Sequence, residues 1–191
     1  MTSREEAILA VEKLLRYIEN ENKELREGVF DTPERVISSY DEIFSGYGED
    51  PANVLDSTFN AEGFEGIVLL DGVEFHSTCE HHFIVIDGVA HIAYIPNKKI
   101  IGLSKINRIV RFFAQRPQVQ ERLTNQIAQC LQEVLNPRGV AVVLEGKHFC
   151  MLSRGVQKQN SIATSSSMLG IFREKESTRN EFLKLIEMNN I

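Results

Sequence analysis

The chain is poor in the residues that mark several large classes of protein. Its 191 residues include no Trp, only three Cys and only five Pro. Three cysteines cannot build a disulfide framework, so we expect free thiols or metal ligands. No apolar run approaches the roughly 20 residues of a membrane helix, and the polar start is not typical of a signal peptide. These absences predict a cytoplasmic protein with no membrane partner.

Basic residues are fewer than acidic residues. The 21 Lys and Arg residues face 27 Asp and Glu residues, which gives a formal net charge of −6. An acidic balance argues against a nucleic-acid partner, although a local basic cluster can still hold a phosphate group. The length suits one domain of ordinary size with a helical extension.

The hydrophobic pattern predicts an α+β fold with antiparallel pairing. Helices come first, then strand pairs, two helices, more strand pairs and a last helix, which is not the alternation of a parallel βαβ fold. Residues 3–21 predict a helix that opens with a capping box from Ser3 and Glu6. We divide the chain into an N-terminal helical extension, residues 1–60, and a catalytic domain, residues 61–191.

Two Asp-Gly pairs and one serine predict where later elements turn or begin. Asp71-Gly72 and Asp87-Gly88 each lie between short apolar runs and predict hairpin turns. Ser104 is expected to cap the first of two central helices. The second of these helices is expected to end near Leu135.

The segment Cys79-Glu80-His81-His82 carries the strongest chemical signal. Two residues separate Cys79 from His82, so one turn can present both to a cation. With Cys150 they would form a three-ligand site that leaves one position for water, whose pKa an open zinc site lowers to about 7. His81 and His148 remain beside it as imidazoles suited to proton transfer.

Other interpretations of this segment stay open. A lone Cys-x-x-His is weak evidence, because isolated cysteines are commonly core residues. Three of the five histidines and two of the three cysteines fall in two short segments, which favours a metal. A fourth ligand from Glu80, His81 or His148 would instead close the site into a structural one.

A second cluster is basic. Ser104, Lys105 and Arg108 open a helix, where free N–H groups and the helix dipole favour an anion. Arg154 follows Cys150 by four residues. The alternative is a solvated charged face, which the pattern alone favours. Glu121 is at the start of the next helix, where a carboxylate usually complements the helix dipole, and the pattern alone favours this role. The alternative is that Glu121 accepts hydrogen bonds from adjacent N–H donors of a ligand.

These segments, taken together, resemble the GTP cyclohydrolase I family. The matching stretches are Thr32–Val36, Ser77–His82, His91–Pro96, Gly102–Lys105, Gln118–Thr124, His148–Met151 and Arg154–Val156. They occur in the family's order and span about residues 30–186.

The resemblance implies a tunnelling fold, in which antiparallel sheets from several subunits close into a barrel with helices outside. It implies a homo-oligomer, a decamer of two stacked pentamers with active sites at subunit boundaries. The implied reaction converts GTP and water to 7,8-dihydroneopterin triphosphate and formate, at the head of pterin and folate biosynthesis, with Zn²⁺ as cofactor.

Residue roles follow from the same resemblance. Cys79, His82 and Cys150 are the implied zinc ligands, and His81 and His148 the implied catalytic pair. Glu121, with Gln120 adjacent, is expected to anchor the guanine edge. The triphosphate clamp is expected to consist of Ser104, Lys105, Arg108 and Arg154, with Arg35 reaching in from a neighbouring subunit.

The chain departs from the family pattern at a few positions. Ser38 stands where a basic residue is usual, so one phosphate contact expected of the family lacks its usual residue here. Two rival hypotheses therefore accompany the zinc hydrolase. One is a degenerate paralogue that binds pterin or nucleotide without turnover, and the other is a non-enzymatic scaffold with a closed structural zinc.

Overall fold

The computed structural model describes residues 2–19, 25–48, 50–55 and 57–189. Its contacts divide the chain into two compact units, Met1–Ser45 and Gly46–Ile191. The catalytic boundary at residues 60 and 61 stays a prediction, because a division by contacts does not show which segments catalysis needs.

The first unit is a pair of helices, α1 (Arg4–Glu19) and α2 (Thr32–Ile43), with the short 3-10 helix η1 (Glu27–Val29) between them. The capping box is confirmed: Glu6 N donates to Ser3 Oγ at 3.2 Å, and Ser3 N donates to Glu6 Oε2 at 2.7 Å. Arg4 joins the helices by donating to Glu34 and Asp41. The predicted end of α1 near residue 21 lies outside the described residues.

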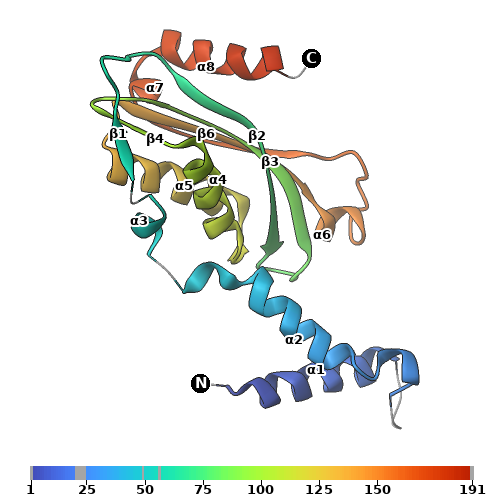
Figure 1. Ribbon diagram of the computed structural model, residues 1–191. Helices are drawn as coiled ribbons and strands as arrows, with labels where there is room; N and C mark the ends of the chain where they lie inside the picture. The colour runs from blue at the N-terminus through green and yellow to red at the C-terminus, as the bar shows by residue number, and fades with distance from the viewer. Residues whose placement is uncertain (1, 20–24, 49, 56, 190–191) are drawn as a thin grey trace. The chain divides into compact units, whose positions relative to one another are not determined.

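A five-stranded sheet with order β5-β2-β3-β6-β7 forms the second unit (Figure 1). Its neighbours pair antiparallel, except that the short β5 lies parallel to β2. The strands are β2 (Val68–Cys79), β3 (Val85–Ile95), β5 (Pro117–Gln118), β6 (Gly139–His148) and β7 (Ala163–Gly170). A smaller sheet pairs β1 (Thr58–Asn60) with β4 (Lys99–Ile101). The predicted α+β class with antiparallel pairing is confirmed.

Helices cover both faces of the sheet. The central pair, α4 (Leu103–Ala114) and α5 (Gln120–Leu135), packs on one face, and α7 (Ile171–Glu174) and α8 (Glu176–Asn189) pack on the other. The remaining helices are η2 (Ser45–Tyr47), α3 (Pro51–Val54) and α6 (Phe149–Leu152). Side chains alternate between the faces of a strand. Ile92 and Tyr94 accordingly join the core under α4 and α5, whereas Ala93 and Ile95 pack with Phe172 of α7 and Phe182 of α8. None of the helices in the described ranges combines the length and apolarity that a membrane crossing needs.

Both predicted Asp-Gly hairpins are wrong, because each pair lies inside one long strand. At Asp71-Gly72 the register of β2 shifts between Leu70 and Val73, and Gly72 takes φ +68°. The extra residue is therefore absorbed as a β-bulge, from which the Asp71 carboxylate contacts Nδ1 of the buried His91.

Gly88 serves close packing rather than a turn. It pairs in register with Gly146 of β6, and a Cβ at Gly88 would lie 2.4 Å from Glu145 O and 2.8 Å from Phe75 Cζ. Glycine at a turn and glycine at a close approach look the same in sequence, which explains the error.

The predicted start of α4 is also wrong by two residues. Gly102, not Ser104, is the N-cap residue, with φ −61° and ψ 132°, and Lys105 N donates to Gly102 O at 2.9 Å. Ser104 consequently lies within the first turn of the helix, where its backbone N–H still points toward the N-terminus.

We predict that Gly88→Ala destabilises the protein, because the new Cβ has no room between Glu145 and Phe75. Overpacking of this kind costs about 1–3 kcal/mol. Urea unfolding at a fixed protomer concentration measures the effect. Gly48→Ala is the matched control, since nothing lies within 4 Å of its added Cβ, and its expected change is within about 0.5 kcal/mol. Equal stability of the two variants would contradict the prediction.

Candidate active site

Three side chains of kinds that can bind a metal converge at one end of the sheet. Cys79 is the last residue of β2, His82 lies in the turn that follows, and Cys150 is in α6. One ligand atom from each lies within 4.8 Å of the other two. Both cysteines are buried and His82 is exposed. Two thiols and one imidazole are a donor set that zinc favours, and the residues therefore fit such an ion.

Backbone hydrogen bonds shape the turn that carries Cys79 and His82. Cys79 N donates to Ile84 O at 2.9 Å, and Phe83 N donates to Cys79 O at 2.8 Å. Phe83 adopts φ +54°, an uncommon conformation for a side chain without local polar groups. The turn is thus closed by the chain itself, before any ion is considered.

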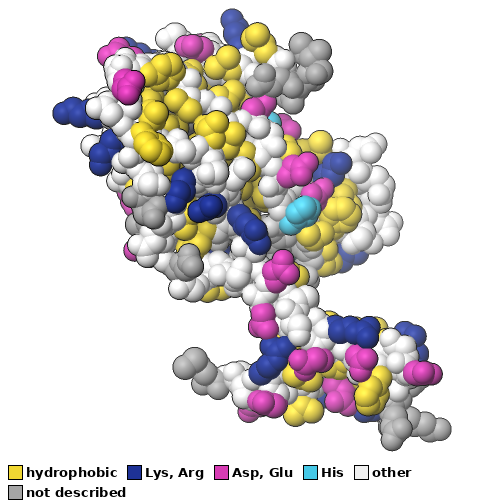
Figure 2. Space-filling model, in the orientation of Figure 1, with side chains coloured by type: hydrophobic (Ala, Val, Ile, Leu, Met, Phe, Trp, Pro, Cys, Tyr) yellow, Lys and Arg dark blue, Asp and Glu magenta, His cyan; other side chains and the backbone are white. Residues whose placement is uncertain are grey.

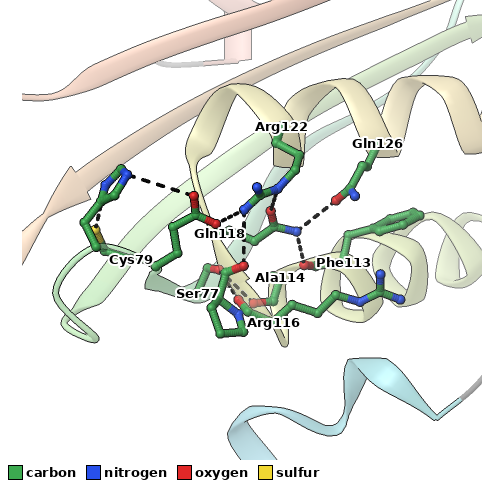
Figure 3. A network of polar contacts seen from close by, with 11 residues as sticks. Ser77, Cys79, Phe113, Ala114, Arg116, Gln118, Arg122 and Gln126 are labelled. Carbon is green, nitrogen blue, oxygen red and sulfur yellow. Dashed lines mark hydrogen bonds and ion pairs between the residues drawn. The ribbon is translucent and has the colours of Figure 1, made fainter.

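A polar network ties this turn to the central helices (Figure 3). Glu80 N donates to Gln118 O at 3.0 Å, and Arg122 of α5 forms an ion pair with the Glu80 carboxylate. Arg122 Nε also donates to Gln118 Oε1 at 3.0 Å. Two residues before Cys79, Ser77 Oγ of β2 donates to Ala114 O at the end of α4, at 2.7 Å. The first turn of α5 and the last residue of α4 therefore both brace the end of β2.

Two imidazoles accompany the ligand set. His81 is largely exposed, with its Nδ1 3.9 Å from Cys79 Sγ and its Nε2 3.9 Å from Glu80 Oε1. His148 ends β6, where it pairs with Ile86 of β3, and its Nε2 lies 2.8 Å from Gln120 Oε1. Burial lowers the pKa of His148, and the nearby Glu121 carboxylate opposes this shift.

The thiols respond to burial and to each other. Burial raises the pKa of Cys150, and a hydrogen bond with Cys79 raises it further, while Arg154 acts in the opposite direction. Thiols must lose their protons to bind a metal, so loading this site releases protons. The third cysteine, Cys130 of α5, has a pKa raised to about 11, chiefly by burial, and is not part of the ligand set.

The structure brings some of the predicted substrate residues to this centre. Glu121 lies close enough to His148, and Arg154 close enough to Cys150, for each charge to affect the neighbouring pKa. Glu121 and Arg154 are both exposed. Gln120 is buried and hydrogen-bonded to His148, so its amide faces the protein interior.

Other predicted residues lie apart from the centre. Ser104, Lys105 and Arg108 are in the first half of α4, whose last residue contacts Ser77. Ser104 and Ala114 are ten positions apart on the helix, roughly 15 Å along its axis. Basic side chains gather over the region of α4 and α5 in Figure 2, despite the acidic net charge.

Arg35 belongs to the first unit, where it donates to Asp31 at 3.2 Å. Ser38 stands where the family usually has a basic residue, and its Oγ accepts a hydrogen bond from Arg4 at 2.9 Å. A guanidinium therefore does lie beside this position.

Sequence reasoning missed the roles of Arg122 and Gly146. Arg122 holds Glu80, the side chain that was open as a fourth ligand. The available signal was its spacing of four from Gln118, which Arg122 also contacts from the first turn of α5. Gly146 lies against Gln120: a Cβ there would be 2.5 Å from Gln120 Oε1. Nothing in the local sequence signals that contact, because the two residues are on different elements.

Comparison with known proteins agrees with this geometry. The family model described as GTP cyclohydrolase I matches residues 7–187. GTP cyclohydrolase 1 of Leptospira biflexa is 51% identical over 92% of this chain and 95% of its own length. The Rickettsia bellii protein of the same name is 48% identical over 96% of this chain and 95% of its own. With two thiols and an imidazole gathered beside a second histidine, and with similarity along nearly its whole length, the chain belongs to the GTP cyclohydrolase I family.

Proposed function

We propose that this protein converts GTP and water to 7,8-dihydroneopterin triphosphate and formate at the Cys79–His82–Cys150 centre. One observation carries the proposal: three ligand atoms lie within 4.8 Å of one another, and His148 comes two residues before the ligand Cys150, with Glu121 in electrostatic reach. A metal-assisted hydrolysis needs a cation, a proton donor and a substrate anchor, and these side chains can provide all three.

Zinc is the proposed metal, held by Cys79, His82 and Cys150. When bound, it supplies a Lewis acid that makes water nucleophilic near neutral pH. The same ligands also accept iron or another divalent ion, so metal analysis belongs in the test.

The chain's own residues supply the acid–base and binding steps. Guanine C8 is a poor electrophile until N7 is protonated, and His148 is proposed to deliver that proton. Glu121 is proposed to accept hydrogen bonds from the adjacent N–H groups at the guanine edge. His81 is proposed to move protons between the site and solvent, and its exposure and the 3.9 Å between its Nδ1 and Cys79 Sγ support this.

The triphosphate clamp is proposed to involve more than one copy of the chain. Arg154 lies near Cys150, whereas Ser104, Lys105 and Arg108 are toward the far end of α4. We therefore propose that the α4 start of a neighbouring copy completes each site, within the decamer that the family resemblance implies. Arg35 is proposed to reach a phosphate in the same assembly.

The rival function, nucleotide binding without turnover, predicts a different result with GTP. Zinc-loaded protein incubated with GTP should release formate and, after oxidation, yield a fluorescent pterin. We expect His148→Ala to retain its metal and lose about 10²–10⁴ in kcat, the usual contribution of a positioned acid. Absence of formate from the wild type over a wide range of GTP concentrations would favour the rival. Loss of metal in His148→Ala would contradict the division of roles.

We predict that Cys150→Ser loses metal and activity together, because one of three ligands is removed. Metal content per protomer, measured by atomic absorption after dialysis, gives the result. Cys130→Ala is the matched control, since Cys130 is equally buried but lies outside the ligand group. A Cys150→Ser protein with a full complement of metal would show that the three side chains do not form the site.

A subunit-mixing experiment tests the shared clamp. Cys150→Ser and Lys105→Ala homomers are each expected to be inactive or nearly so. Co-expressed in equal amounts, they should recover activity in up to about a quarter of sites, because a wild-type metal centre then meets a wild-type clamp from another copy. No recovery in verified mixed oligomers would place the clamp and metal centre in one chain.

A further inference from the structure

Gln120 is almost completely buried, and both ends of its side-chain amide have partners. The side chain belongs to the first residue of α5 and is 3% exposed. Its Nε2 lies 3.1 Å from Leu144 O of β6, 2.8 Å from Ala163 O of β7 and 3.1 Å from Ser165 Oγ. Backbone carbonyl oxygens only accept hydrogen bonds, so the NH₂ end of the amide must face the strands.

The orientation of the amide determines which atom of Gln120 faces the His148 ring. With its NH₂ group turned to β6 and β7, Gln120 presents Oε1 to His148 Nε2 at 2.8 Å. A carbonyl oxygen is an acceptor, and Nε2 must therefore carry the hydrogen. In a neutral imidazole the lone pair is then on Nδ1, because each ring nitrogen takes one of the two roles.

The backbone beside this contact is shaped to admit it. A Cβ at Gly146 of β6 would lie 2.5 Å from Gln120 Oε1, so only glycine leaves the oxygen in place. Thr124 of α5 adds support from the next turn: its Oγ1 donates to Gln120 O at 2.7 Å and lies 2.6 Å from Ser165 Oγ. Three elements thus hold one amide oxygen against one imidazole.

We propose that Gln120 is a positioning residue that acts through His148: it holds the Nε2–H, so that Nδ1 takes up a proton from solvent and passes it to guanine N7, which leaves the ring neutral again. This inference rests on the proposed function, in which His148 delivers a proton to guanine. The family resemblance instead suggested that Gln120 helps Glu121 to bind the guanine edge. Contact with a base would break hydrogen bonds that the amide already makes, which favours the positioning role.

Steady-state kinetics and GTP binding separate the two roles. Gln120→Leu removes the acceptor, and we expect kcat to fall about 10–100-fold with KM within about twofold of wild type, since ground-state binding is untouched. Glu121→Gln should show the opposite pattern, a raised KM. Gln129→Leu, an exposed glutamine on the same helix, is the control and should match wild type.

A second measurement does not depend on turnover. GTP affinity is measured by calorimetry on metal-loaded His148→Ala, with and without Gln120→Leu. A change of Kd within about twofold supports positioning, because the partner through which Gln120 acts is already gone. A Kd at least about tenfold weaker in the double variant would overturn the inference and assign Gln120 to the base.

Gly146→Ala covers the case in which Gln120→Leu does not fold. It keeps the glutamine but displaces Oε1, so the same fall in kcat with unchanged KM is expected. Wild-type kcat in Gly146→Ala, with normal metal content, would overturn the inference. If the wild type itself releases no formate, the proposed function fails; if it does and these variants change KM or Kd instead of kcat, only the role of Gln120 fails.

Discussion

The register between β3 and β6 is the constraint on which the site depends. It places His148 opposite Ile86 of β3, next to Val85, which pairs on the other edge of β3 with Thr78 of β2. Residues about 70 positions apart in sequence are thereby brought to the same end of the sheet. A slip of one residue would turn every side chain of β6 to the opposite face, and His148 would leave Gln120 and the ligand group.

The core enforces that register from both sides. Val140, Val142 and Leu144 point into the apolar cluster under α4 and α5, while Ala141 and Val143 meet the cluster formed with α7 and α8. Both faces of β6 are buried, each in a different apolar cluster. A change of register would therefore exchange the side chains that the two clusters receive. The catalytic geometry is therefore maintained by ordinary hydrophobic packing far from the reacting atoms.

Much of this arrangement could be predicted from the sequence. The Cys79–His82 spacing, the second segment with His148 and Cys150, and the two amphipathic helices all rest on local patterns. The errors have a physical reason. Asp71-Gly72 and Asp87-Gly88 carry turn chemistry, yet the first is a bulge and the second a close approach between strands. The inward orientation of Gln120 depends on β6 and β7, and no local pattern near residue 120 reveals it.

The first turn of α5 has one further consequence. Gln120, Glu121 and Arg122 follow one another around the helix: Gln120 contacts the imidazole of His148, the exposed Glu121 acts on the same imidazole through its charge, and Arg122 pairs with the Glu80 carboxylate. Successive residues on a helix diverge by about 100°, so three neighbours serve three separate tasks from a single rigid body. Any shift or rotation of α5 would disturb all three at once. Exchanging a single side chain on that turn therefore changes one of these contacts at a time, whereas moving the helix changes all three.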